Sequence, residues 1–314
     1  MKTKVAVLYT IMCLIWGSTW LAMKIGLEDL PPFLFAGVRF AIAFVILGFV
    51  LKAQGFSLKL QKNEIWPILI LGVFMIALPY GLVFWGQQYT NSAMGATLMC
   101  TLPLLIFPIS YLMKSDEELN LSKLLGVVIG LSGVFVIFYP KLTGGGTSLK
   151  GDLAIFASVF IYSFTTVYLK KYAAHISIKK CVFYQLLVGA PLLIIFGLLV
   201  ESPHRFIDGL MHWKALVALL YLAVFGSLVT FLIYYWLIRR IGAVASASAI
   251  FIEVGLAVFL DWAVMSVIPH AYTWVGMAFI FLGVWLVVVY GKAIKTPGVF
   301  EDVSPALIDA DTRV

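Results

Sequence analysis

Apolar stretches of about twenty residues recur ten times along the chain, and short segments containing the polar residues separate them. At about 1.5 Å per residue, a helix of this length crosses the roughly 30 Å hydrocarbon layer of a bilayer. Backbone groups in lipid must find partners within their own segment, so the stretches predict helices and not strands. The predicted spans are residues 5–26, 31–52, 66–87, 92–113, 121–139, 151–170, 179–200, 213–236, 243–268 and 272–291.

The composition lies far outside the range of soluble domains. Hydrophobic residues make up 62% of the 314 residues and charged residues 12%, with a mean hydropathy of +1.04. Soluble domains contain about 45–50% apolar and about 25% charged residues, so lipid must cover much of this surface. We therefore expect an all-α membrane protein whose surroundings are the lipid bilayer.

Positively charged residues set the predicted orientation. The net charge is +7, but Lys and Arg occur in short clusters between the apolar stretches, which indicates membrane topology and not nucleic-acid binding. With the N-terminus inside, most of the 22 Lys and Arg residues fall in cytoplasmic segments. Since an even number of spans returns the chain to its starting side, both termini are predicted to be cytoplasmic, in a multi-pass protein of the cell inner membrane.

Residues typical of metal or nucleotide sites lack the necessary spacing. Cys13, Cys100 and Cys181 stand alone in apolar stretches, and the four histidines lie in presumed loops. We therefore expect no metal and no cofactor. The chain has no G-x-x-x-x-G-K-[ST] motif, so any transport would draw on a gradient and not on a bound nucleotide.

The spans divide into two groups of five at PKLTGGGTSLKG, residues 140–151. Residues 126–139 resemble 276–289 at an offset of 150, which pairs Gly126 with Gly276 and Gly133 with Gly283. Because five is odd, a second copy of a five-helix unit must begin on the opposite face of the membrane. We predict two inverted repeats around a central cavity, with the binding site where they meet. The predicted units are residues 1–139, 151–291 and a disordered cytoplasmic tail at 292–314.

A carboxylate is predicted near the middle of the bilayer. Glu253 lies about ten residues, or about 15 Å, from the cytoplasmic end of its span, and the first repeat places Pro103 at the matching position. An isolated ionised acid at this depth costs at least a few kcal/mol, so it must be protonated, paired or next to a wet cavity. Two interpretations remain open: a functional acid in the cavity, with proton coupling as one hypothesis for its role, or a protonated acid that joins two helices.

Two further charges lie within predicted spans. Asp261 and Arg39 fall at similar depths near the outer surface, where an ion pair would neutralise both. We predict a structural Arg39–Asp261 pair.

Aromatic and polar residues are mixed at the middle of several spans, which suits an amphipathic or aromatic small molecule held by stacking, cation–π contact and a few hydrogen bonds. Ordinary packing is the alternative for each residue taken singly. The predicted substrate-binding residues are Trp16, Ser18, Thr19, Tyr80, Trp85, Gln88, Pro103, Tyr162, Tyr234 and Glu253.

LIWGSTWLAMKIGLEDLPPFLFAGVRF, residues 14–40, resembles the opening of EamA-type members of the drug/metabolite transporter superfamily. The matching residues are Trp16, Gly17, Ser18, Lys24, Pro32, Arg39 and Phe40, and the resemblance extends over residues 5–291. It implies ten helices in two inverted repeats, a central cavity and export of small metabolites such as amino acids. The chain departs from the family pattern where Val254 follows Glu253 in place of a proline, and Asp261 has no counterpart in it.

The main hypothesis is therefore a secondary transporter that exports a small metabolite, such as an amino acid, by alternating access. An uptake permease of the same fold, for a nucleoside-like or cofactor metabolite, is the alternative, because fold does not separate import from export. An intramembrane enzyme is a remote third possibility. It is disfavoured because the sequence has no H-E-x-x-H or G-x-S-x-G motif and each histidine lies at a membrane edge.

Overall fold

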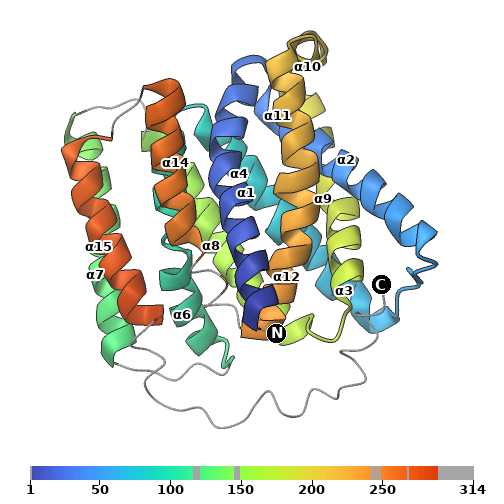
Figure 1. The fold of residues 1–314 in the computed structure, drawn as a ribbon, viewed down its shortest axis with the longest axis horizontal. Coiled ribbons are helices and arrows are strands. Elements are labelled where there is room, and N and C mark those ends of the chain that lie inside the picture. Colours follow the sequence, from blue (N-terminus) through green and yellow to red (C-terminus); the bar gives the residue numbers. More distant parts are fainter. Residues whose placement is uncertain are drawn as a thin grey trace.

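The computed structural model describes residues 2–115, 121–144, 149–241, 246, 249–266 and 269–288. Within these residues the chain forms helices and no strands. The predicted tail, the middle of the predicted 140–151 break and residues 267 and 268 lie outside the described part. The helices stand side by side in one bundle (Figure 1).

The first half of the bundle contains five helical regions. They are α1 (Lys2–Asp29), α2 (Pro32–Ala53), the continuous run of α3 (Lys62–Leu71), η1 (Gly72–Ala77) and α4 (Leu78–Gln87), the broken pair α5 (Ser92–Met99) and α6 (Leu102–Leu112), and α7 (Leu121–Gly144).

The second half follows the same order with one short helix added. It contains α8 (Leu149–Tyr172), α9 (Ile178–Val200), the short α10 (Pro203–Leu210), the run of α11 (Trp213–Ala223), η2 (Val224–Val229) and α12 (Thr230–Ile241), then α14 (Ile250–Met265) and α15 (Ala271–Val288).

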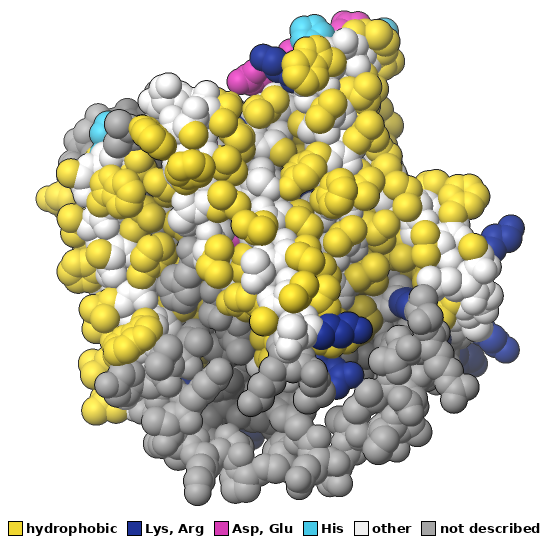
Figure 2. Space-filling view, viewed as in Figure 1, with side chains coloured by type: hydrophobic (Ala, Val, Ile, Leu, Met, Phe, Trp, Pro, Cys, Tyr) yellow, Lys and Arg dark blue, Asp and Glu magenta, His cyan; other side chains and the backbone are white. Residues whose placement is uncertain are grey.

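Within the described residues, eight helical stretches are long and apolar enough to cross a membrane, so the protein is a multi-pass membrane protein. They are Thr3–Asp29, Pro32–Ala53, Lys62–Gln87, Ser92–Leu112, Leu121–Tyr139, Leu149–Tyr172, Ile178–Val200 and Trp213–Ile238. The regions of the ninth and tenth predicted spans are the shorter helices α14 and α15. Hydrophobic side chains cover most of the visible face of the bundle, as a lipid-facing surface requires (Figure 2).

The third and eighth regions each contain a turn of π-helix, at η1 and η2, and η2 begins 152 residues after η1. A π turn holds one extra residue and leaves its carbonyls poorly paired within the helix. In η2 the Ser227 hydroxyl donates to the Leu222 carbonyl at 2.8 Å, and the Thr230 hydroxyl donates to the Phe225 carbonyl at 3.1 Å. Side-chain hydroxyls therefore stabilise this irregular turn inside the membrane.

The helices α7 and α15 lie side by side (Figure 1) and make the most extensive helix pair among the described residues. They meet through glycine. A Cβ atom built on Gly126 would lie 2.6 Å from the Gly283 carbonyl oxygen, and one on Gly133 would lie 2.5 Å from that of Gly276. Gly126 contacts Gly283, and Gly133, further along α7, contacts Gly276, which comes earlier on α15. The two helices therefore run antiparallel. In the repeat alignment, Gly126 corresponds to Gly276 and Gly133 to Gly283. In the structure each glycine of α7 instead contacts the counterpart of the other one, which is the pattern that a two-fold axis between the repeats produces.

We predict that Gly133→Val lowers the free energy of unfolding by about 1–3 kcal/mol, because the added side chain meets backbone that cannot move aside. Thermal unfolding in detergent measures this effect. Gly255→Ala on α14 is the matched control, since nothing lies within 4 Å of its added Cβ. Equal melting temperatures for the two variants would contradict tight α7–α15 packing.

Candidate functional site

A cavity lies in the middle of the bundle, between the two halves of the chain. The volume open to the centres of water molecules is about 70 Å³. Its walls come from α1, α2, α4, α5 and α6 of the first half, and from α8, η2, α12 and α14 of the second. The lining residues are Trp16, Thr19, Trp20, Met23, Arg39, Pro79, Tyr80, Val83, Met99, Leu102, Ser158, Tyr162, Gly226, Tyr234, Ser246, Ile250 and Glu253.

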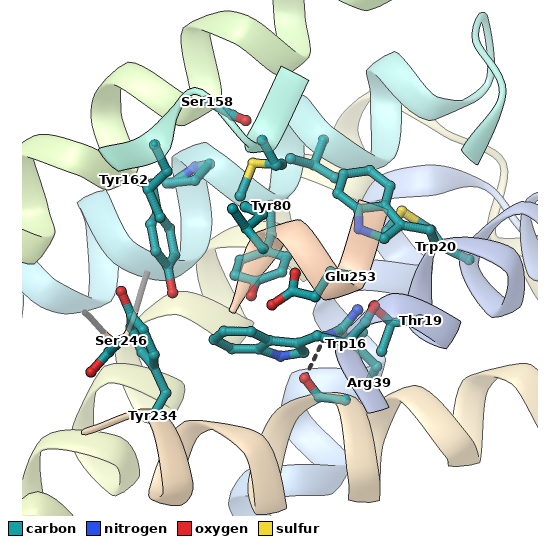
Figure 3. Close-up of a pocket in the computed structure, with 17 residues that line it drawn as sticks. Trp16, Thr19, Trp20, Arg39, Tyr80, Ser158, Tyr162, Tyr234, Ser246 and Glu253 are labelled. Carbon is teal, nitrogen blue, oxygen red and sulfur yellow. Dashed lines mark hydrogen bonds between the residues drawn. The ribbon is translucent and has the colours of Figure 1, made fainter. Parts of the chain in front are cut away.

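The Glu253 carboxylate points into this cavity, above the ring of Trp16 (Figure 3). Helix α14 carries it close to α1, because Gly17 has no side chain and a Cβ there would lie 3.2 Å from the Glu253 Cα. Only 5% of Glu253 is exposed. In the part of the chain that the structure describes, its carboxylate makes no hydrogen bond or ion pair. The contact proposed between a protonated Glu253 and a neighbouring helix is therefore not formed.

A buried cation, Arg39, lines the same cavity and is 2% exposed. Its Nε donates to the Ser227 hydroxyl at 3.1 Å, on the π turn η2. One terminal nitrogen donates to the carbonyl of Gly226, on the same turn, at 3.4 Å (Figure 3). The guanidinium also lies 4.6 Å from the ring centroid of Phe40 and 5.2 Å from that of Tyr80. Dipoles and aromatic faces hold the cation in place, and among the described residues no carboxylate lies within 4.0 Å of it.

Aromatic side chains form the remaining walls of the cavity. The rings of Trp16 and Tyr234 pack at 5.0 Å between centroids, and Tyr162 and Tyr80 face the same space (Figure 3). The Tyr234 hydroxyl is buried without a hydrogen bond of normal geometry and interacts only loosely with Thr166. The cavity therefore offers one carboxylate, one guanidinium and several aromatic surfaces to a ligand.

The predicted Arg39–Asp261 ion pair is wrong. Asp261 accepts a hydrogen bond from the Ala93 backbone N–H at 2.8 Å, in the first turn of α5. Helix α14 packs against α1 and α5, whereas α2 packs mainly against α9. Similar depth in the membrane therefore did not bring the two side chains together, because they project toward different neighbours.

A family model, EamA-like transporter family, matches residues 3–139 and again residues 149–289. The chain belongs to the EamA family. The resemblance seen in the first spans is thereby confirmed, and the protein is a membrane transporter and not an enzyme.

Named relatives cover most of this EamA chain. "Uncharacterized transporter YvbV" of Bacillus subtilis is 30% identical over 80% of each chain. "Uncharacterized transporter YoaV" of the same organism is 29% identical, over 79% of this chain and 84% of its own. "Uncharacterized inner membrane transporter YedA" of Escherichia coli K12 is 26% identical over 87% of each. One crystal structure has the same fold, with a TM-score of 0.66 and 19% identity over 94% of this chain and 99% of that chain.

Six of the ten predicted substrate-binding residues of the EamA chain line the cavity, and four lie elsewhere. The Ser18 hydroxyl is 2.6 Å from that of Tyr221. Pro103 stands in the first turn of α6, just after the break that follows α5, and its neighbour Leu102 lines the cavity instead. Proline suits this position because the first helical turn needs no N–H donor from it. Trp85 and Gln88 line a separate pocket.

That second pocket has a volume of about 540 Å³ and lies where α2 begins and α4 and α9 end. Glu201 lines this pocket, and its carboxylate accepts hydrogen bonds from the Phe33 and Leu34 backbone N–H groups, both at 2.8 Å. A carboxylate at this position complements the partial positive charge at the start of α2. Burial raises the pKa of Glu201, and the two backbone donors and Arg205 oppose that rise.

Trp20 and Met23, the cavity residues of α1 that were not predicted, carried a signal in their spacing. Trp16, Thr19, Trp20 and Met23 recur at intervals of three and four, which places them on one helix face. Arg39 was predicted as part of an ion pair and not as part of the cavity wall. Its orientation toward η2 was not foreseeable, because the π turn has no distinct sequence pattern.

We predict that Ser227→Ala lowers the free energy of unfolding by about 1–3 kcal/mol, because the Arg39 Nε–H and the Leu222 carbonyl both lose their partner. Chemical or thermal unfolding in detergent measures the change. Tyr234→Phe is the control, since it removes a buried hydroxyl without a normal hydrogen bond and should not lower stability. A loss of the same size in both variants would contradict a specific Arg39–Ser227 interaction.

Proposed function

We propose that this EamA-family protein is a secondary transporter of the cell inner membrane that exports a small zwitterionic metabolite, such as an amino acid, by alternating access. The central cavity is the binding site. One observation carries the proposal: a buried carboxylate and a buried guanidinium face the same enclosed space, and neither has an oppositely charged partner within 4.0 Å among the described residues.

Uncompensated charges are costly inside a membrane protein, and that cost argues for a ligand that supplies the missing charges. A zwitterion does so with one molecule, its ammonium group toward Glu253 and its carboxylate toward Arg39. A guanidinium suits a carboxylate because its planar N–H donors match the two oxygens. Trp16, Tyr80 and Tyr162 would surround the rest of the ligand, which favours an apolar or aromatic side chain.

Alternating access requires two halves that move against each other, and we assign these to residues 1–139 and 151–291 as inverted repeats that together supply ten transmembrane helices. Three features support the assignment: the antiparallel α7–α15 contact with its exchanged glycine partners, the matching π turns η1 and η2, and the contribution of both halves to the cavity. The clusters of Lys and Arg support cytoplasmic termini. Export is carried over from the family resemblance.

We expect L-amino acids to raise the melting temperature of the detergent-purified protein, by an amount that grows with ligand concentration. Their N-acetyl derivatives and methyl esters, which each lack one charge, should have little effect. Glu253→Gln and Arg39→Met should each weaken binding about tenfold or more, because each leaves one ligand charge without a partner.

Glu64→Gln is the matched control for these variants. Glu64 is also a buried acid, but it is paired with Lys180 at 3.3 Å, and neither residue lines the cavity. This variant should keep full ligand binding. If all three forms of an amino acid shift the melting temperature equally, the zwitterion assignment is wrong.

A proton gradient is the proposed driving force, with Glu253 as the proton carrier. In proteoliposomes, Glu253→Gln should abolish the stimulation of transport by a pH gradient while exchange of labelled for unlabelled amino acid continues at raised substrate concentration. Transport by the variant that still responded to the pH gradient would rule out this role.

A further inference from the structure

One wall of the cavity closes on the side where α1 ends. The Trp20 ring lines the cavity and packs against Gly95 of α5. A Cβ atom built on Gly95 would lie 2.5 Å from the Trp20 ring and 2.6 Å from the Gln87 Oε1. The Trp20 indole and the Gln87 amide therefore meet at this glycine, with Trp20 on the cavity side.

Gln87 is fully buried, and both polar atoms of its side chain amide lack a hydrogen-bond partner in the described structure. A carboxamide can donate two hydrogen bonds and accept two, and buried polar groups are nearly always paired. Packing alone would favour leucine or methionine at such a position. The amide is suited instead to a polar group that passes or rests there in another state of the protein.

Two charged side chains hold the backbone around Gln87 in place. The Lys24 ammonium group, on α1, donates to the Gln87 and Thr90 carbonyls at 3.2 Å and 2.8 Å, where α4 ends. Asp261, on α14, accepts from the Ala93 N–H at 2.8 Å, where α5 begins. Each charge also complements the helix end that it touches.

Lys24 and Asp261 act on the two sides of one short connection, residues 88–91, and they attract each other across it. They belong to the first and second halves of the chain respectively. Separation of α1 and α14 from this connection would break the backbone contacts of both side chains. It would also uncover Gln87 directly behind the Trp20 ring.

We propose that Gln87 lines the outer route between the cavity and the medium, and that Lys24 and Asp261 form the latch that closes this route. The proposal rests on the proposed transport function for its direction, since the outer side follows from the cytoplasmic N-terminus. A buried carboxamide recognises the ammonium and carboxylate groups of a zwitterion equally well, because it both accepts and donates hydrogen bonds.

The test is the reactivity of a cysteine at the proposed route. Gln87→Cys is made in a chain whose three native cysteines, all buried, are replaced by alanine. It keeps the backbone carbonyl that Lys24 binds. A membrane-impermeant maleimide, applied to right-side-out vesicles, should label Cys at this position slowly. Adding Lys24→Met or Asp261→Leu should accelerate labelling about tenfold or more. Each variant removes a hydrogen bond of a charged group from the closed state, which shifts the equilibrium toward the open, reactive state by about that factor.

Lys171→Met is the matched control. Lys171 likewise donates to a backbone carbonyl where a helix ends, that of Met113 after α6, but it lies at the other end of the bundle. Its loss should not accelerate labelling at position 87. A second chain that keeps only Cys181, buried where α9 begins on the cytoplasmic side, is labelled in detergent, where the reagent reaches both ends of the bundle. It reports general loosening, because that thiol should stay unreactive in every variant.

Unchanged labelling at position 87 in both latch variants would overturn the proposal. Equal acceleration at Cys181 would also overturn it, since the variants would then only unfold the bundle. The readout needs no substrate, so accelerated labelling at position 87 alone would support the latch even if no amino acid bound to the protein. Accelerated labelling without amino-acid binding would therefore contradict the proposed ligand but not the proposed outer route.

Discussion

The hydrocarbon interior of a bilayer offers no hydrogen bonds, so each polar group that this chain carries into it needs a partner within the protein. Backbone groups meet this requirement by forming helices. Serine and threonine hydroxyls meet it by donating to carbonyls of their own helix, as Ser158 does to Ile155 and Thr166 does to Tyr162. Lys24 and Asp261 meet it at helix ends. Among the described residues, the Gln87 amide and the Glu253 carboxylate are exceptions, and Glu253 is the charged exception that lines the cavity.

Close helix contacts bring this exception to the centre of the bundle. Gly17 lets α14 approach α1, which carries Glu253 to the cavity, and the glycines of α7 and α15 join the outer helices of the two halves. Arg39 depends on a different device, since the η2 turn provides both its hydroxyl and its carbonyl acceptor. Small residues and one irregular turn therefore position the charges, while the large apolar side chains fill space and face lipid.

Hydropathy along the sequence was enough to locate the helices, because a membrane span must be long and apolar wherever it packs. It was also enough to single out Glu253, whose charge is anomalous at that depth. It could not predict the direction in which a side chain points around its helix. Apart from Lys52 in its last turn, α2 is apolar on every side except at Arg39, so its sequence has no polar face that would orient it. The Arg39–Asp261 error has this origin. Trp85 and Gln88 were misplaced for a different reason, because they lie near the end of α4, beyond the part of that helix that reaches the cavity.

The two π turns also bear on how the helices could move. Each stores one residue more than an α-helical turn, just before the segment that carries Tyr80 or Tyr234 into the cavity. Moving that extra residue along the helix would turn the segment that it passes by about 100° and shift it by about 1.5 Å, while each backbone N–H of that segment exchanges one carbonyl acceptor for the next. Such a shift of the π turns in the third and eighth regions would rotate the aromatic walls of the cavity, while the ends of both helices stay in place at the membrane surfaces.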